Sequence, residues 1–155
     1  MADKSVNVPT VKPAKAHILA NSSLCGGCRT CEAVCSLDKE GIVNPELSRI
    51  YVKKDILGGY ICEPIPCKQC EDPACLLACP TGALHIDCVT GARVIDDRIC
   101  DGCQLCLEVC PVTPTRIGYH PEQNVCFKCD LCGGDPQCVK FCPMGALTYL
   151  KAEGV

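Results

Sequence analysis

The sequence predicts an α+β fold built from short strands and short helices, and three observations lead to this prediction. The 155-residue chain has 19 Cys, no Trp and only 4% aromatic residues, so a core of bulky side chains is missing. Seventeen of the Cys fall into four groups, each confined to a short stretch. The stretch 81–84 (Thr-Gly-Ala-Leu) after the second group returns as 144–147 (Met-Gly-Ala-Leu) after the fourth, which indicates an internal duplication. We therefore expect a unit of strand, Cys-rich loop, short helix and strand, used four times.

The clearest Cys group runs from Cys100 to Pro111 with the spacing C-x2-C-x2-C-x3-C-P. This spacing holds [4Fe–4S] clusters in bacterial-type ferredoxins. Cys100, Cys103 and Cys106 lie on a loop short enough to wrap one face of such a cluster. Cys110 lies about one helical turn beyond Cys106 and is carried away from that cluster, so it is expected to serve a neighbouring one. The motif therefore predicts a partner motif elsewhere in the chain.

The other three Cys groups follow related spacings. The first has the spacing x2, x2, x3 and carries Ser36 where Pro would usually follow. The second has the spacing x2, x4, x3 before Pro80, and the fourth offers five Cys before Pro143. In order, the members of these groups are Cys25, Cys28, Cys31 and Cys35; Cys67, Cys70, Cys75 and Cys79; and Cys126, Cys129, Cys132, Cys138 and Cys142.

These Cys could form disulfides, bind zinc or ligate iron–sulfur clusters. The Cys count is odd, and the first ten residues show neither an apolar signal segment nor a twin-arginine pair. A reducing cytoplasm is therefore expected, which favours metal ligation over disulfides. Zinc sites usually combine two C-x2-C pairs or Cys with His, whereas His17, His85 and His120 are scattered. We therefore predict four [4Fe–4S] clusters, with a zinc-filled structural or interaction module as the alternative.

Charge and motifs exclude several functions. The formal net charge is −3 without a basic run, which argues against a nucleic-acid partner. No apolar run is long enough to cross a bilayer, so no transmembrane segment is expected. No glycine-rich nucleotide loop is found, and nothing points to a catalytic apparatus. The sequence therefore predicts a conductor of electrons, not an enzyme. The side chains of Lys53, Lys54 and Lys128 are expected to be solvated, with partner docking as the alternative.

The pattern also predicts several local elements. Residues 1–15 are interpreted as an extended N-terminal arm. Strands are expected at 16–20 and 49–53, with a polar connection at 37–47. The apolar stretches 84–86 and 92–95, separated by a Thr-Gly pair, predict a hairpin that leads into the third Cys group.

With these four Cys groups, the chain resembles the four-cluster ferredoxin subunits that accompany molybdenum and tungsten oxidoreductases, over roughly residues 19–150. The resemblance implies one double-dicluster unit at 16–155 with two bacterial-ferredoxin-like halves, about 16–55 with 112–155, and about 56–111. It also implies that the first group pairs with the fourth, and the second with the third. The ligand sets carried over in this way are Cys25, Cys28, Cys31 and Cys142; Cys129, Cys132, Cys138 and Cys35; Cys67, Cys70, Cys75 and Cys110; and Cys100, Cys103, Cys106 and Cys79.

The fourth group departs from this family in two ways. The separation of Cys132 from Cys138 is short, where the family often has a long insertion. Cys126 with Cys129 also makes a rival C-x2-C pair, and the resemblance favours Cys129 with Cys132. Cys62, Cys88 and Cys126 are then left over. We expect them to pack as small hydrophobic side chains, with a spare ligand or a reactive thiol as the alternative.

The segments 25–37 and 44–50 resemble the small iron–sulfur subunit coded beside tungsten-dependent aldehyde oxidoreductases. This resemblance implies a catalytic tungsten–pterin subunit as partner, with electrons passing onward to a FAD- and NAD-binding subunit or a ferredoxin. The alternative within the same chemistry is the equivalent subunit of another molybdopterin oxidoreductase, a formate dehydrogenase or a hydrogenase complex. A separate hypothesis is that copies of the chain bind one another end to end and so extend the path of the electrons.

Overall fold

The computed structural model describes residues 16–151, so the N-terminal arm expected at 1–15 lies outside the described residues. The unit of strand, Cys loop, helix and strand does recur four times. The four repeats are β1 (Ala16–Ala20), α1 (Thr30–Glu40) and β2 (Tyr51–Asp55); β3 (Ile61–Ile65), α2 (Ala74–Leu77) and β4 (Leu84–Ile86); β5 (Arg93–Ile95), α3 (Leu105–Glu108) and β6 (Ile117–His120); and β7 (Val125–Lys128), α4 (Gln137–Lys140) and β8 (Leu147–Lys151). The predicted α+β fold of short elements is therefore confirmed.

The strands of residues 16–151 form four separate two-stranded antiparallel sheets. Three are hairpins of consecutive strands, β2–β3, β4–β5 and β6–β7, while β1 pairs with β8 from the other end of the chain. The strand predicted at 16–20 and the hairpin of 84–86 with 92–95 are confirmed. The strand predicted at 49–53 begins two residues later, at Tyr51.

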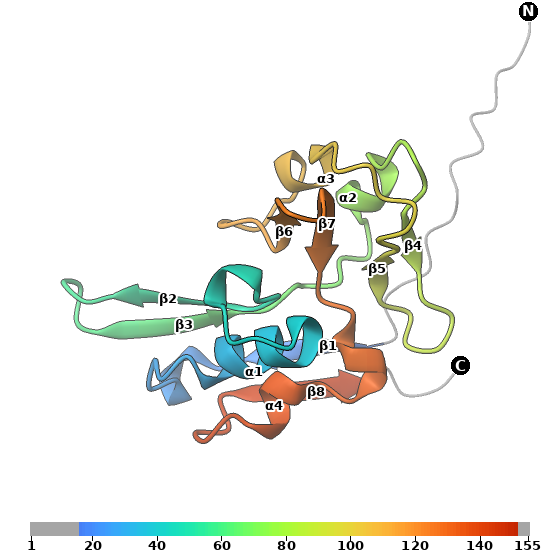
Figure 1. Ribbon diagram of the computed structural model, residues 1–155. Helices are drawn as coiled ribbons and strands as arrows, with labels where there is room; N and C mark the ends of the chain where they lie inside the picture. Colours follow the sequence, from blue (N-terminus) through green and yellow to red (C-terminus); the bar gives the residue numbers. More distant parts are fainter. Residues whose placement is uncertain (1–15, 152–155) are drawn as a thin grey trace, which may run out of the picture.

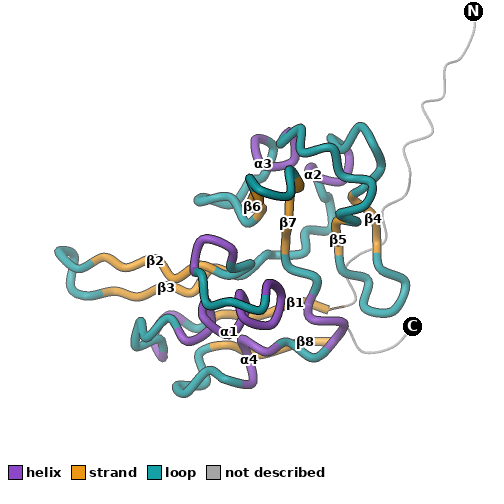
Figure 2. The backbone as a smooth tube through the Cα atoms, in the orientation of Figure 1, coloured by secondary structure: helices purple, strands orange, loops and turns teal. Residues whose placement is uncertain are grey.

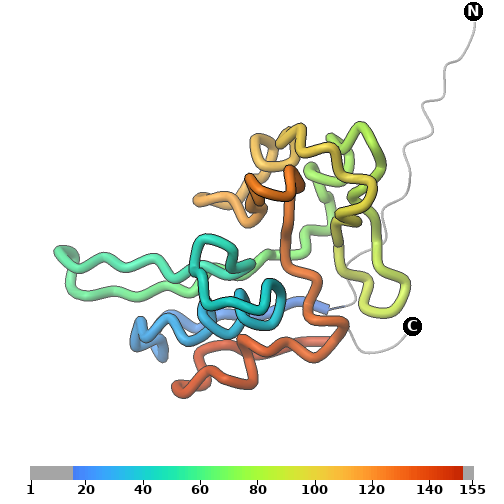
Figure 3. Tube along the Cα trace, in the orientation of Figure 1, coloured from blue at the N-terminus to red at the C-terminus, as the bar shows by residue number. Residues whose placement is uncertain are grey.

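The elements gather into two lobes (Figure 1). The terminal lobe contains β1, β8, α1, α4 and the projecting β2–β3 hairpin, and the central lobe contains α2, α3 and the strands β4 to β7 (Figure 2). Helix α1 packs on α4 in one lobe, and α2 packs on α3 in the other. The described residues 16–151 start and finish in the terminal lobe and form the central lobe between these two segments (Figure 3). The half boundaries predicted at 55/56 and 111/112 stay a prediction.

Helix α1 is much longer than the other three helices, and Ser36 is the reason. Proline follows the last Cys of the other groups and cannot continue a helix. Helices α2, α3 and α4 have four residues each, against eleven in α1. At Ser36 the hydroxyl donates to the Glu32 carbonyl and accepts from the Asn44 N–H, at 3.1 and 3.0 Å. The polar connection predicted at 37–47 is therefore wrong at its start, because α1 continues to Glu40.

Cysteine side chains fill much of the interior. The larger core, which lies mainly in the terminal lobe, joins Ile18, Val52 and Leu131 to several buried Cys and extends to Ala92 beside β5. The smaller core of the central lobe joins Leu84 and Ile117 to two more. The buried Cys are Cys31, Cys35, Cys62, Cys67, Cys129 and Cys138 in the first core and Cys106 and Cys126 in the second. Within residues 16–151, no helix combines the length and apolar character that crossing a membrane requires.

Candidate metal centres

Each Cys loop contains the same backbone turn. The residue before the second Cys of each predicted set is left-handed, with φ of 69° at Gly27, 50° at Gln69, 72° at Gly102 and 59° at Leu131. Glycine adopts this conformation without strain. A Cβ at Gly27 would also lie 2.5 Å from the Cys62 sulfur. The recurring turn is a structural signature of the four-fold repeat.

The same turn distinguishes the two rival pairs in the fourth group. Leu131, just before Cys132, has the left-handed turn, whereas Lys128, just before Cys129, belongs to strand β7. The pair Cys129 and Cys132 therefore has the loop found in the other groups, and this supports the choice made from the resemblance.

Three cavities are each lined by one complete predicted ligand set. We number the sets as sites in the order in which they lie in space. Site 1 is Cys25, Cys28, Cys31 and Cys142; site 2 is Cys35, Cys129, Cys132 and Cys138; site 3 is Cys67, Cys70, Cys75 and Cys110; and site 4 is Cys79, Cys100, Cys103 and Cys106. Sites 1, 3 and 4 surround cavities. Sequence positions far apart thus meet, as the pairing of first with fourth and second with third group requires.

Site 2 is brought together by the packing of α1 on α4. Cys35 on α1 and Cys138 on α4 are both buried, as is Cys129 after β7. Burial raises the pKa of the Cys138 thiol, and the negative charges of Cys35 and Cys132 raise it further. The four sulfurs are therefore close enough to interact electrostatically.

Burial makes many of these thiols hard to ionise. It raises the pKa of Cys31 to about 12, and it raises the pKa of Cys106 and of Cys129 as well. A buried thiolate needs a compensating positive charge, and iron bonded to the sulfur supplies it. No three His, Cys, Asp or Glu side chains in the described part of the chain converge on a single-ion site. The donor set of four Cys around each cavity fits a [4Fe–4S] cluster, which takes one sulfur at each iron.

Several sulfurs accept hydrogen bonds from the chain. Backbone N–H groups donate to the last Cys of three groups: Arg49 to Cys35 at 3.3 Å, Leu84 to Cys79 at 3.5 Å, and Ala146 to Cys142 at 3.3 Å. The Thr30 hydroxyl donates to Cys28 at 3.3 Å and lowers its pKa. Such bonds stabilise negative charge on sulfur and are a known means of tuning cluster potentials.

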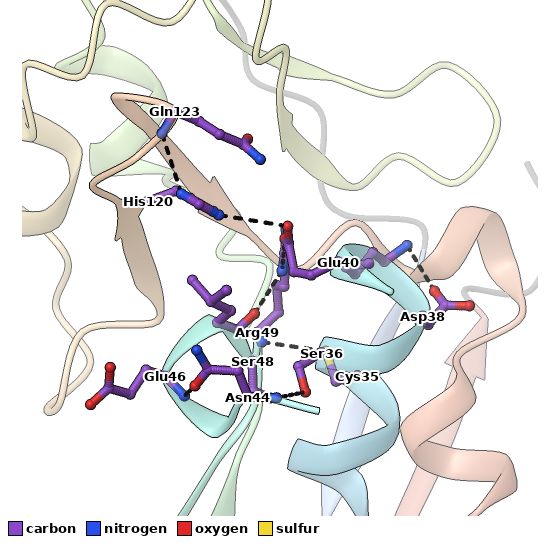
Figure 4. A network of polar contacts seen from close by, with 12 residues as sticks. Cys35, Ser36, Asp38, Glu40, Asn44, Glu46, Ser48, Arg49, His120 and Gln123 are labelled. Atoms are coloured by element: carbon purple, nitrogen blue, oxygen red, sulfur yellow. Dashed lines mark hydrogen bonds and ion pairs between the residues drawn. The ribbon is translucent and has the colours of Figure 1, made fainter. Parts of the chain in front are cut away.

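A chain of contacts from Arg49 through Glu40 to His120 joins the two lobes (Figure 4). The Arg49 guanidinium lies 2.5 Å from a Glu40 carboxylate oxygen at the end of α1. The other Glu40 oxygen lies 3.9 Å from the His120 ring at the end of β6 in the central lobe. One residue therefore supplies both a hydrogen bond to the Cys35 sulfur and a contact that leads to the other lobe.

The three leftover Cys lie in different surroundings. Cys62 and Cys126 are each 3% exposed, as expected for small hydrophobic side chains. Cys126 lies beside site 4 rather than with Cys129, and its N–H donates to the Cys100 sulfur at 3.3 Å. Cys88 is exposed, so the packing expected for it is wrong. It lies in the turn between β4 and β5 and belongs to neither buried core.

The four sites lie in series. In addition to burial, the charge of Cys31 in site 1 raises the pKa of Cys138 in site 2. In the same way, the charge of Cys67 in site 3 raises the pKa of Cys129 in site 2. The charge of Cys75 in site 3 raises the pKa of Cys106 in site 4. Each site therefore has a neighbour within electrostatic reach, from site 1 through sites 2 and 3 to site 4.

The two ends of this series reach the surface. Cys28 of site 1 and Cys103 of site 4 are exposed, whereas every Cys of sites 2 and 3 is buried or half-buried. None of the nineteen Cys, all of which belong to the described residues, forms a disulfide. The series thus has two accessible ends and a covered middle.

Comparison with known proteins identifies the family. A family model described as "4Fe-4S dicluster domain" matches residues 59–152. The aliphatic sulfonate oxidoreductase, polyferredoxin-like subunit of Pyrococcus furiosus is 46% identical over 134 residues, which cover 86% of this chain and 75% of that protein. The probable anaerobic dimethyl sulfoxide reductase chain YnfG of Escherichia coli K12 is 35% identical over 154 residues, covering 86% and 72%.

A solved structure is similar as well. The active site complex BamBC of benzoyl coenzyme A reductase, in complex with 1,5-dienoyl-CoA, contains a chain with a TM-score of 0.53 and 26% identity, covering 90% of this chain and 78% of that one. The predicted iron–sulfur chemistry and the non-catalytic, electron-transferring role are confirmed by these relatives. The chain therefore belongs to the 4Fe–4S dicluster domain family, as an electron-transfer iron–sulfur protein.

Proposed function

We propose that the chain holds four [4Fe–4S] clusters, one at each of sites 1 to 4, and carries electrons between a catalytic subunit and a second redox partner. The observation that carries this proposal is the series of four-Cys sites with an exposed Cys at either end. When bound, each cluster takes up and releases one electron. The protein side chains hold the clusters in sequence and shield the middle two from water.

The catalytic partner that we propose is a tungsten–pterin subunit that oxidises aldehydes. Its support is the resemblance carried by residues 25–37 and 44–50. A FAD- and NAD-binding subunit or a ferredoxin is the proposed second partner. Because the relatives are named for a sulfonate oxidoreductase and a dimethyl sulfoxide reductase, another molybdopterin oxidoreductase, a formate dehydrogenase or a hydrogenase is the alternative partner.

The projecting β2–β3 hairpin supports docking beside site 1. Its tip exposes Ile56, Leu57 and Tyr60, at 68%, 99% and 61%. Its base packs on site 1, because Val52 and Pro64 line the same cavity as the site 1 Cys. Apolar side chains gathered at one exposed place are typical of interaction surfaces. We infer that the catalytic subunit covers this tip. Nineteen Cys without a disulfide favour the cytoplasm as the location.

The test is anaerobic purification from the native host, with iron, tungsten, molybdenum and zinc counted and the bound subunits identified. We expect about sixteen iron atoms per chain, a brown colour and a tungsten-containing partner. Molybdenum in place of tungsten would favour the alternative partner. Folded, colourless protein containing zinc and no iron would overturn the proposal.

A pair of variants tests the ligand assignment in the fourth group. Cys129→Ala should lower the iron content by about four atoms, the content of one cluster. Cys126→Ala is the matched control, since Cys126 is a neighbouring buried Cys outside the four sets, and it should keep the iron content of the wild type. The opposite result would assign Cys126 as the ligand.

A further inference from the structure

Site 3 is surrounded by buried positive charge. Its cavity is lined by the four Cys of the site and by Lys68, Arg93, Arg116 and Lys128. Arg93, Arg116 and Lys128 are 0%, 9% and 7% exposed, whereas Lys68 is exposed. The expectation that Lys128 is solvated is therefore wrong. Strand β7 carries it inward, where its ammonium donates to the Arg93 carbonyl at 2.7 Å.

Backbone carbonyls hold these cations in place. Arg93 donates to the Gly91 carbonyl at 3.0 Å and to the Glu71 carbonyl at 3.4 Å. Gln69 holds strand β5, which carries Arg93, in place. The Gln69 side chain accepts a hydrogen bond from the Arg93 N–H at 2.7 Å and donates one to the Cys129 carbonyl at 2.8 Å.

Arg116 is held in a similar way. It donates to the Pro114 carbonyl at 2.9 Å and to the Ile65 carbonyl at 3.2 Å, and its guanidinium lies 5.3 Å from the centre of the Tyr51 ring. The two carbonyl acceptors of Arg116 are neutral, so they do not cancel the positive charge of its guanidinium. The carboxylate of Glu71 interacts electrostatically with Arg93, and the carboxylate of Glu32 interacts with Arg116.

The other sites have fewer buried cations, and carboxylates pair with those that lie near them. Arg49, next to Cys35 of site 2, has a side chain that is 12% exposed, but its guanidinium lies 2.5 Å from the Glu40 carboxylate. Arg29 lines site 1, but its side chain is 45% exposed and lies 3.8 Å from the Glu32 carboxylate. Lys39 acts on Cys132 of site 2, but Asp130 holds its ammonium at 2.9 Å. Among the described residues that line the site 4 cavity, there is an aspartate, Asp101, and no lysine or arginine.

We propose that Arg93, Arg116 and Lys128 give site 3 the highest reduction potential of the four sites, so that an electron entering the series comes to rest there. This inference rests on the proposed function. Reduction adds one electron at site 3, and the neighbouring site that supplies it is oxidised by one electron. The added negative charge is stabilised by nearby cations, and more so where water is excluded, because the effective dielectric constant is lower. Arginine keeps its charge at all accessible pH values.

An electron that rests at site 3 is separated from both ends of the series. Site 3 lies inside the series and has no exposed Cys. An electron arriving from either partner is therefore held away from solvent, and both partners exchange electrons with the same internal store.

The test is an anaerobic redox titration of the cluster-loaded full chain, followed by electron paramagnetic resonance. Arg116→Gln should lower the highest of the four reduction potentials by at least about 59 mV, which corresponds to a tenfold change in the equilibrium constant of a one-electron reduction. Arg116→Lys keeps the charge and should recover most of the shift. Lys68→Gln is the matched control: it lines the same cavity, but water screens its charge, so its shift should be much smaller.

A Cys110→Ser variant identifies the signal, because only site 3 contains Cys110. The component that it alters should be the one that Arg116→Gln moves. Arg93→Gln provides a second, independent cation variant. The inference would be overturned if four reducible components are seen and the potential of none of them shifts in the cation variants. It would also be overturned if the potential that shifts belongs to a component that Cys110→Ser leaves unchanged. Either result would leave the proposed function standing. Fewer than four reducible components in the wild type would instead count against the proposed function.

Discussion

Single residues decide how the common repeat varies from one unit to the next. Ser36 is fully buried and stands where the other three groups carry proline. With a backbone N–H and a hydroxyl in place of the proline ring, α1 continues to Glu40, whose carboxylate meets Arg49 and faces His120. One departure from the motif thus lengthens a helix and links it to the other lobe.

Replacing Ser36 with the proline of the other groups should destabilise the protein. Ser36→Pro removes a helical hydrogen bond and places the ring against the Glu32 carbonyl, which costs about 3 kcal/mol or more. Ser36→Ala, the control, removes only the hydroxyl and leaves the Asn44 N–H without its acceptor, at about 1–3 kcal/mol. Thermal unfolding of the iron-loaded proteins should show the larger drop in Tm for Ser36→Pro. Equal Tm values for Ser36→Pro and the wild type would contradict this account.

At the scale of elements, three of the four strand pairs join consecutive strands, yet they differ in use. The β4–β5 and β6–β7 hairpins pack in the central lobe, and Lys128 on β7 reaches the Arg93 carbonyl on β5. The β2–β3 hairpin instead projects beyond the body of the terminal lobe (Figure 1). Its base covers site 1 and its tip is free to meet a partner.

Introducing charge at the tip should weaken capture of the catalytic subunit. Leu57→Lys places an ammonium where we infer an apolar contact, so less partner should co-purify, while iron content stays at the wild-type value. Val89→Lys is the control, because Val89 is an exposed apolar residue on a different hairpin turn. Equal loss of partner in both variants, or no loss in either, would show that the β2–β3 tip is not the docking element.

At the scale of the whole molecule, the clusters take the place of a conventional core. Eight Cys belong to the buried residues of the two cores, and burial raises the pKa of several of them. Without iron, these sulfurs are neutral thiols around empty space, and the packing that joins the Cys loops is lost. Metal binding and folding are therefore coupled.

Removing the clusters should unfold both lobes. Anaerobic treatment with a strong iron chelator should greatly lower hydrogen-exchange protection in α1 to α4 and in the strands beside them. Adding iron and sulfide back to the same sample should restore protection, which controls for irreversible damage. Protection that stays at the holoprotein level after complete iron removal would contradict the coupling.

The amino-acid sequence was sufficient to predict the repeating unit and its chemistry, because the spacing of Cys within a loop is a local property. The iron–sulfur prediction and the four groups came from that spacing, and the hairpin between the second and third groups came from two apolar stretches around a Thr-Gly pair. The pairing of distant groups needed the resemblance to a family, since spacing within one loop carries no information about which other loop faces it.

The order of the sites, their exposure and their electrostatic surroundings depend on the folded arrangement and could not be predicted from the sequence. Arg93, Arg116 and Lys128 stand far apart in the chain and carry no motif, yet strand packing places all three around site 3. Cys126 likewise stands in the fourth group and lies beside site 4. The physical reason is that charge and burial act through space, so they depend on how segments pack and not on how they are spaced along the chain.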